Sequence, residues 1–198
     1  MTVDVARGYA KGRAKRRQIL EEATALFGEV GYRSASLREV AARCGISHPG
    51  LLHHFPSKEL LLRAVLELRD EVDQERFDLD AGTGTERLER LLDLIAHNAR
   101  VPGIVELYAV LSAEASAPDH PAHDYFVDRY AGHRAALTEV FSSVRDEGRL
   151  ADDVDPADLA AMTLALADGL QVQWLLDRQS VDMAAAMRQF LALVVRPD

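Results

Sequence analysis

Apolar residues recur at intervals of three and four positions along almost the whole 198-residue chain, and no segment shows the convincing alternation of a half-buried strand. This periodicity is the feature that most restricts the fold, because it favours helices over a sheet. Glycine, proline and capping residues divide the pattern into about nine segments. The chain is therefore predicted to be all-α, with helices over 13–29, 36–43, 48–54, 58–75, 85–99, 103–117, 121–147, 156–178 and 182–195.

The formal charge of −9 is unevenly distributed. Residues 1–60 contain ten Lys or Arg and six Asp or Glu, a net charge of +4, whereas residues 61–198 contain thirteen and twenty-six, a net charge of −13. A basic segment joined to an acidic body is typical of a polyanion-binding module attached to another domain. We expect a flexible basic arm over 1–12, a basic helical module over 13–75 and a helical body over 76–198.

Several classes of protein are disfavoured by simple counts. Cys44 is the only cysteine, so the chain is not a disulfide-stapled scaffold. The longest run without a charged residue or histidine, Leu159–Ala167, has nine residues, whereas a membrane-spanning helix needs about twenty. No apolar stretch of signal-peptide length follows the N-terminal basic residues. We therefore expect a soluble cytoplasmic protein with no membrane contact.

The segment 36–55 has the spacing of a helix-turn-helix. Ser36 with Glu39 three positions later is a capping-box pattern, and Gly45 can end the first short helix in a left-handed conformation. Ser47 then caps a second short helix whose first turn contains Pro49. An ordinary pair of packed helices has the same pattern, but the surrounding basic charge favours a helix that enters a DNA major groove.

A dense series of motifs occupies residues 13–68, about a quarter of the chain: Gly31-Tyr32, Ser36-Leu37-Arg38-Glu39-Val40-Ala41, Cys44-Gly45-Ile46-Ser47, Leu51, His54-Phe55-Pro56-Ser57-Lys58 and Leu60-Leu61. In order and spacing the series resembles the signature of the tetracycline-repressor (TetR) family. The resemblance implies a homodimeric transcriptional regulator, usually a repressor that binds a palindromic operator, whose C-terminal domain dimerises and binds a small effector. One position departs from the family pattern, because Leu52 replaces a phosphate-contacting tyrosine; His53 or His54 is the expected substitute.

The DNA contacts are predicted from the head of the chain. We expect the outer face of the second short helix to read bases through His48, Pro49, Gly50 and His53. Phosphates are expected to meet helix N-termini and basic side chains, namely Ser36, Ser47, Lys58, Arg13, Arg16, Arg17 and Arg38.

The body carries two predicted sites. Aromatic and polar residues among apolar stripes indicate an effector pocket, for which the candidates are Leu107, Tyr108, Leu111, Tyr125, Phe126, Tyr130, His133, Met162, Gln171 and Trp174. The last two helices carry apolar stripes that would be exposed on a monomer, so a dimer interface is predicted at Leu159, Met162, Leu166, Leu170, Phe190, Leu193 and Val194. The alternatives are an ordinary core for the first set and packing within one chain for the second.

Competing functions have weaker support. We expect no enzyme and no cofactor, because the sequence contains no glycine-rich phosphate loop, nucleophile elbow or paired metal motif. We expect no metal at His48, His53 and His54 or at His120 and His123, since no cysteine or carboxylate joins them at ligand spacing; an effect of protonation on DNA binding is the other hypothesis that they raise. A protein-interaction module, an activator, and a regulator without an effector stay open.

Overall fold

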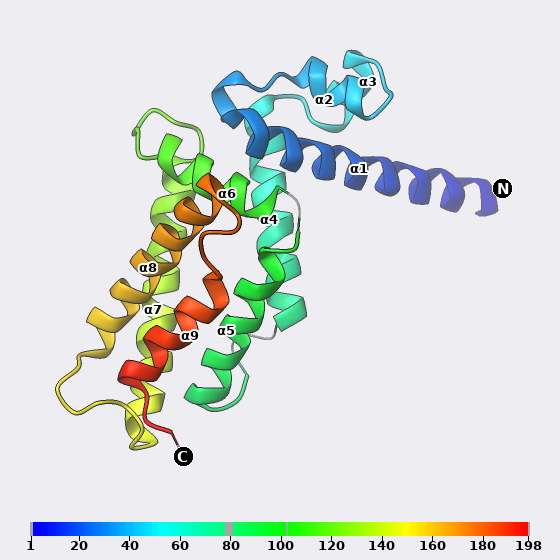
Figure 1. The fold of residues 1–198 in the computed structure, drawn as a ribbon. Helices are drawn as coiled ribbons and strands as arrows, with labels where there is room; N and C mark the ends of the chain where they lie inside the picture. The colour runs from blue at the N-terminus through cyan, green and yellow to red at the C-terminus, as the bar shows by residue number, and fades with distance from the viewer. Residues whose placement is uncertain (1, 78–80, 102, 198) are drawn as a thin grey trace.

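The computed structural model describes residues 2–77, 81–101 and 103–197 and, in those ranges, nine helices with no β-strand. Figure 1 shows their arrangement, with the first three helices at one end of the molecule and the later helices packed below them. The all-α prediction is confirmed. The helices are α1 (Thr2–Ser34), α2 (Leu37–Arg43), α3 (His48–His54), α4 (Lys58–Phe77), α5 (Gly84–Asn98), α6 (Ile104–Glu114), α7 (His123–Asp146), α8 (Pro156–Leu176) and α9 (Met183–Val194).

The start of α1 differs from the prediction. The helix begins at Thr2 instead of near Arg13, so the segment expected to be a flexible arm is helical in its described part. The alanine, arginine and lysine residues of this segment are strong helix formers, and they extend a helix whose later turns are anchored in the core. At its other end Gly31 adopts φ 76° and ψ 165°, which interrupts the helix near the predicted position.

Short capping sequences place α2 and α3. The Ser36 hydroxyl accepts from the Glu39 amide at 3.1 Å, and the Ser47 hydroxyl accepts from the Gly50 amide at 3.2 Å. Gly45 in the intervening turn has φ +64°, the left-handed conformation that favours glycine. The serine caps and the glycine turn therefore form as predicted, whereas the capping box is only half formed, because the Glu39 carboxylate pairs with Arg43.

The head, which we define as α1–α3 with the start of α4, shares a core with the body, α5–α9. Leu107 and Leu111 of α6 are fully buried in the cluster that contains Phe27 of α1. The Glu114 carboxylate also accepts a hydrogen bond from the Tyr32 amide at 2.8 Å. His120, predicted at the surface beside a helix start, is 3% exposed and packs edge-on against the Tyr32 ring. The boundary predicted near residue 75 is thus not a break in packing.

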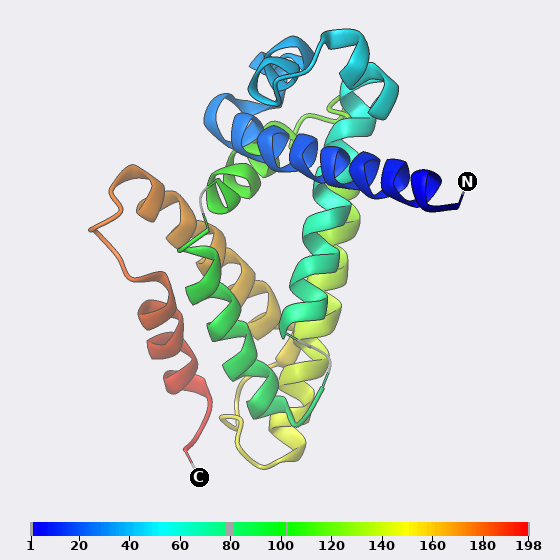
Figure 2. The same cartoon turned by 90° about the vertical axis from the view of Figure 1, so that its right-hand side faces the viewer.

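The body is a helical bundle. Its helix α7 packs against α5 and α8, and α9 packs against α5 and α8. Figure 2 shows α4 running from the head down the side of this bundle, so one helix spans both parts of the molecule. Asp155 caps α8 by accepting from the amides of Ala157 and Asp158, with Pro156 at the first helical position as predicted.

Candidate functional site

The small helix α3 is held by its buried side. Leu51 and Phe55 are almost completely buried and pack with Val40 of α2, so the opposite side of α3 faces outward. On that side Pro49 and His53 are exposed, whereas His48, Gly50 and His54 are partly exposed. The predicted base-reading residues therefore share one accessible end of the head.

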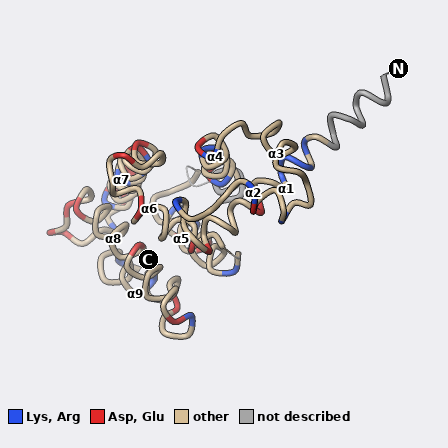
Figure 3. Tube along the Cα trace, turned by 90° about the horizontal axis from the view of Figure 1, so that it is seen from above, with Lys and Arg blue, Asp and Glu red and all other residues tan. Residues whose placement is uncertain are grey.

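Basic side chains of α1 lie beside this helix. Figure 3 shows lysine and arginine positions near the described start of α1 and acidic positions on α7 and beside α8 and α9. Arg13, Arg17 and Arg38 are exposed. The Arg16 guanidinium lies 4.3 Å from the centre of the Phe55 ring, which brings α1 beside the end of α3.

Two of the predicted phosphate-contacting residues are partly engaged within the chain. Arg17 forms an ion pair with Glu21 at 3.1 Å. The Lys58 ammonium donates to the carbonyl of Arg33 at 3.3 Å and lies 4.4 Å from the centre of the Tyr32 ring. Part of the Lys58 side chain is removed from solvent, and this burial lowers the pKa of its ammonium group.

Sequence reasoning overlooked one basic residue near α3, Lys15. Its ammonium donates to the carbonyl of Cys44 at 3.3 Å and ties α1 to the turn between the short helices. The His53 and His54 rings have centres 5.7 Å apart at an interplanar angle of 68°. Among the described side chains, no group of three or more His, Cys, Asp or Glu is placed to bind a metal ion.

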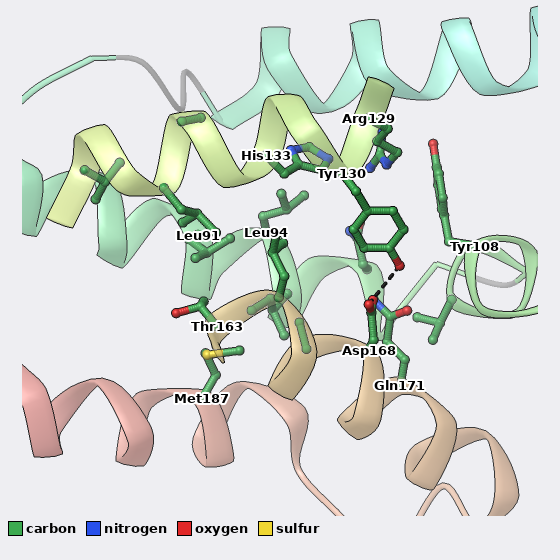
Figure 4. A pocket seen from close by; sticks show the side chains of 18 of the residues that line it. Leu91, Leu94, Tyr108, Arg129, Tyr130, His133, Thr163, Asp168, Gln171 and Met187 are labelled. Carbon is green, nitrogen blue, oxygen red and sulfur yellow. Dashed lines mark hydrogen bonds between the residues drawn. The ribbon is translucent and has the colours of Figure 1, made fainter. Parts of the chain in front are cut away.

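A cavity of about 230 Å³ lies inside the body, with lining residues from α5, α6, α7, α8 and α9. Figure 4 shows Leu91, Leu94 and Met187 at one end and Tyr108, Tyr130, Asp168 and Gln171 at the other. The cavity is smaller than the roughly 300–1,000 Å³ of pockets for drug-sized ligands. It therefore suits a small molecule with distinct apolar and polar parts.

The structure divides the predicted pocket residues into two groups. Tyr108, Phe126, Tyr130, His133 and Gln171 line the cavity. The others are elsewhere: Leu107 and Leu111 are in the core, Tyr125 donates to Asp70, Met162 is 54% exposed, and Trp174 is buried beneath the Arg178 guanidinium. These five lie outside the cavity lining, and the sequence pattern did not show this because it does not give the rotation of each helix about its axis.

Several polar lining residues were not predicted, namely Arg87, Asn98, Arg129, Thr163 and Asp168. One signal was present in the sequence for Asp168, because Asp158 and Asp168 are the only charged residues of the otherwise apolar α8. Asp158 is explained by the helix N-terminus, where a carboxylate is favourable. Asp168 has no such explanation and marks a polar position on the buried side.

One polar cluster joins α4 to the cavity wall. The Asp70 carboxylate of α4 accepts from the Arg129 guanidinium, from the Tyr125 hydroxyl at 2.7 Å and from the Tyr108 hydroxyl at 3.4 Å. The Arg129 guanidinium also lies 4.4 Å from the centre of the Tyr108 ring. Because Arg129 and Tyr108 line the cavity, a ligand that moves either side chain acts on Asp70 and hence on α4.

Arg69, the neighbour of Asp70 on α4, makes a second link by donating to the Asn98 side chain, which also lines the cavity. On the opposite wall the Tyr130 hydroxyl donates to Asp168 at 2.8 Å. Burial raises the pKa of Asp168 and raises that of Tyr130 to about 12. Burial, with the positive charge of Arg129, lowers the pKa of His133 to about 4, so this imidazole is neutral near pH 7.

An apolar face is exposed on α8 and α9. Its large residues are Met162, Val172, Leu176 and Leu193, of which Leu193 is 75% exposed. Two of the predicted interface residues, Leu159 and Leu170, are instead buried within the chain, because the helix turns that stripe toward α7 and α9. Leu166, Phe190 and Val194 are partly buried beside them.

By length and composition α8 is apolar enough to cross a membrane, which differs from the expectation of no span. The difference arises because a helix of 21 residues accommodates Asp158 and Asp168, whereas an uninterrupted apolar run does not. A single helix of this kind is weak evidence for a membrane, since helices of soluble proteins have the same composition. An exposed apolar face is as typical of a protein–protein interface as of a membrane contact.

Comparison with known proteins gives a consistent result. Residues 19–65 match the model of "Bacterial regulatory proteins, tetR family", and residues 84–196 match the model of the "BetI-type transcriptional repressor, C-terminal". The HTH-type transcriptional repressor KstR2 of Mycobacterium tuberculosis is 28% identical over 197 residues, with 92% of each chain covered.

Two solved structures have the same fold. A transcriptional regulator from Saccharomonospora viridis in complex with choline has a TM-score of 0.77 at 24% identity, and the match covers 92% of this chain and 98% of the other. AibR in complex with isovaleryl coenzyme A and operator DNA has a TM-score of 0.73 at 24% identity, covering 93% and 100%. At these identities the likeness extends to the fold.

Proposed function

The chain belongs to the tetR family of bacterial regulatory proteins and is a DNA-binding transcriptional regulator, and from this premise we propose that it is a repressor released from its operator by a small effector. The observation that carries this proposal is the pair of links between the cavity and α4, at Asp70 and Arg69. Repression is supported by the names of the C-terminal family model and of the relative KstR2.

The DNA contacts that we propose are those of the accessible end of the head. His48, Pro49, Gly50 and His53 read bases, and His54 binds the phosphate that the apolar side chain of Leu52 cannot bind. Arg13, Arg16, Arg17 and Arg38 hold phosphates together with the capped N-termini at Ser36 and Ser47, whose free amides attract anions. Lys58 contributes a phosphate contact only where its ammonium leaves the carbonyl of Arg33, so we expect a smaller effect from its substitution.

We propose that the repressor acts as a homodimer through the exposed face of α8 and α9. Met162, Val172, Leu176 and Leu193 would leave an apolar patch in water on a monomer, and pairing with a second copy removes it. Two heads on a two-fold axis can occupy successive major grooves about 34 Å apart, which suits a palindromic operator.

The release mechanism is a shift between two conformations. An effector in the cavity stabilises the arrangement of α5–α8 that fits it best, and the links at Asp70 and Arg69 transmit that arrangement to α4. Operator affinity falls in proportion to the difference between the effector's affinities for the two conformations. The ligands of the two solved neighbours, choline and isovaleryl coenzyme A, differ in size and charge. The effector class of this chain therefore has to be inferred from its own cavity.

The same premise argues against an enzyme. The members of this family are named as regulatory proteins and not as enzymes. We therefore propose that the chain catalyses no reaction and uses no cofactor. A soluble DNA-binding regulator acts where the bacterial chromosome is, so we propose a cytoplasmic location.

Selection of bound sequences from random double-stranded DNA, followed by titration at increasing salt, tests the DNA-binding proposal. We expect a two-fold symmetric site and a log–log salt slope of roughly −0.9 per neutralised phosphate. A salt-insensitive complex, or no DNA retention at low salt, would indicate a protein-interaction module instead.

Sedimentation of the Leu193→Asp variant tests the dimer. We expect dissociation into monomers, because the substitution places a charge in the proposed interface while the 75% exposed side chain contributes little to folding of one chain. Val127→Asp is the matched control, since Val127 of α7 is also exposed, at 53%, but lies outside the α8–α9 face. A dimer that survives Leu193→Asp and dissociates with Val127→Asp places the interface elsewhere.

A further inference from the structure

The cavity wall contains one carboxylate. Among the described residues that line the cavity, three have a strongly basic or an acidic side chain, namely Arg87, Arg129 and Asp168. His133 also lines the cavity, but its low pKa leaves its imidazole neutral at pH 7. The balance of these three charges decides which kind of ligand the cavity favours.

Both arginines are neutralised from outside the cavity. Arg129 is bonded to Asp70, and Arg87 pairs with Glu139 at 3.4 Å. Neither Asp70 nor Glu139 belongs to the lining. An anionic ligand would therefore compete with carboxylates that already hold these guanidinium groups.

Asp168 has no such partner. Within the part of the chain that the structure describes, its carboxylate forms no ion pair, and its hydrogen bond comes from the neutral hydroxyl of Tyr130. Burial raises the pKa of Asp168, and the Arg129 guanidinium, which is bonded to Asp70, lowers it in part without pairing with Asp168. A carboxylate has about four acceptor sites, so one hydrogen bond leaves most of its capacity unused. The group is half-buried, where a charge without a direct ionic partner is more costly than in water.

The surroundings of Asp168 suit a cation with an apolar body. Aromatic rings of Tyr108, Phe126 and Tyr130 line the same cavity, and the faces of such rings attract ammonium groups. The far end is formed by Leu91, Leu94 and Met187, as Figure 4 shows. A volume of about 230 Å³ limits the ligand to a small molecule.

Building on the proposed function, we propose that the effector is a small organic cation, an amine or ammonium compound whose charged group pairs with Asp168 while its apolar part fills the Leu91–Leu94–Met187 end. Asp168 is then the residue that selects the ligand by charge. The Tyr130 hydroxyl positions the carboxylate, and Gln171, one turn along α8, is available to a polar substituent.

Three six-carbon probes of different charge test this inference on the full-length protein at pH 7.5: n-hexylamine, n-hexanol and n-hexanoate. At this pH an alkylamine is protonated, because its pKa is near that of lysine, about 10.4. Binding is measured by calorimetry and by the shift in melting temperature. We expect hexylamine to bind at least about tenfold more tightly than either of the others, a difference of about 1.4 kcal/mol.

The decisive variant is Asp168→Asn, which keeps the shape and an acceptor for Tyr130 but removes the charge. We expect it to lose at least about tenfold in hexylamine affinity and to retain its affinity for hexanol. Asp158→Asn is the matched control, because it makes the same change of charge at an exposed position of α8 outside the cavity lining; it should keep the preference for hexylamine. A loss of all three ligands alike in Asp168→Asn would assign Asp168 a structural role and overturn the proposal.

The remaining outcomes separate this inference from the proposed function. Tighter binding of hexanoate than of hexylamine, or no binding of any probe at millimolar concentration, overturns the cation site. Selective hexylamine binding that leaves operator affinity unchanged supports the cation site and contradicts the role of the cavity in release. Absence of operator binding in the ligand-free protein contradicts the proposed repressor, while the preference among the three probes still decides the cation site.

Discussion

Asp70 lies on α4, and its carboxylate accepts from three side chains of the body, Tyr108, Tyr125 and Arg129. Replacing Asp70 by asparagine keeps the size of the side chain and removes its charge. We expect this change to lower both the free energy of unfolding and the operator affinity of the effector-free protein. The reason is that α4 then loses its strongest tie to the wall of the cavity.

The size of the effect follows from the exposure of the pair. A hydrogen bond to a charged group contributes about 1.5–3 kcal/mol, and an exposed ion pair about 0–1 kcal/mol. The side chain of Asp70 is 40% exposed and that of Arg129 is 21% exposed, so solvent screens the pair in part. The loss in unfolding free energy should therefore be about 2 kcal/mol, toward the low end of the charged range.

The same free energy limits the effect on DNA binding. If the tie holds α4 in the arrangement that binds DNA, about 2 kcal/mol corresponds to a decrease in operator affinity of at most about 30-fold. Urea unfolding and operator titration measure the two quantities. Glu71→Gln is the matched control, because Glu71 is the neighbouring exposed carboxylate on α4 and undergoes the same change of charge.

A double-mutant cycle with Arg129→Gln completes the test. Since each single variant breaks the same contact, the double variant should lose less stability than the sum of the two single losses. The reasoning is refuted if Asp70→Asn stays within about 0.5 kcal/mol of Glu71→Gln, the ordinary range for surface substitutions. It is also refuted if the two single losses add without coupling.

Two further predictions concern other parts of the chain. Gly31→Ala should lower the unfolding free energy by about 1–3 kcal/mol through backbone strain at φ 76° and ψ 165°, and by more through the approach of the new methyl group to the Glu114 carboxylate, 2.5 Å away; an unchanged urea midpoint would contradict this. Because burial lowers the pKa of His133 from 6.5 to about 4, its contribution to stability is complete above about pH 7 and decreases as the pH falls toward 4. Between pH 7 and pH 5 the loss is about 2 kcal/mol, and His133→Gln should flatten that part of the stability profile.

Helix boundaries were the part of the fold that local sequence predicted well. The ends of α2, α3 and α8 are set by Ser36, Gly45, Ser47 and Asp155-Pro156, whose effects act within one turn of the chain. The α1 start was mispredicted because no residue of comparable strength marks it, and a helix anchored in the core extends into the preceding alanine, arginine and lysine residues.

The sequence by itself therefore determined the all-α class, the helix-turn-helix and its accessible end, because caps, turns and charge are properties of neighbouring residues. Only the tertiary structure decided which side of each body helix meets the cavity. Apolar residues lie on several sides of α8, so their pattern does not show which side faces the core: Leu159 and Leu170 are buried, whereas Met162 and Leu176 are exposed. The hydrogen-bond partners of Asp70 and Asp168 are between 38 and 59 positions away along the chain, so these contacts form only when the helices pack.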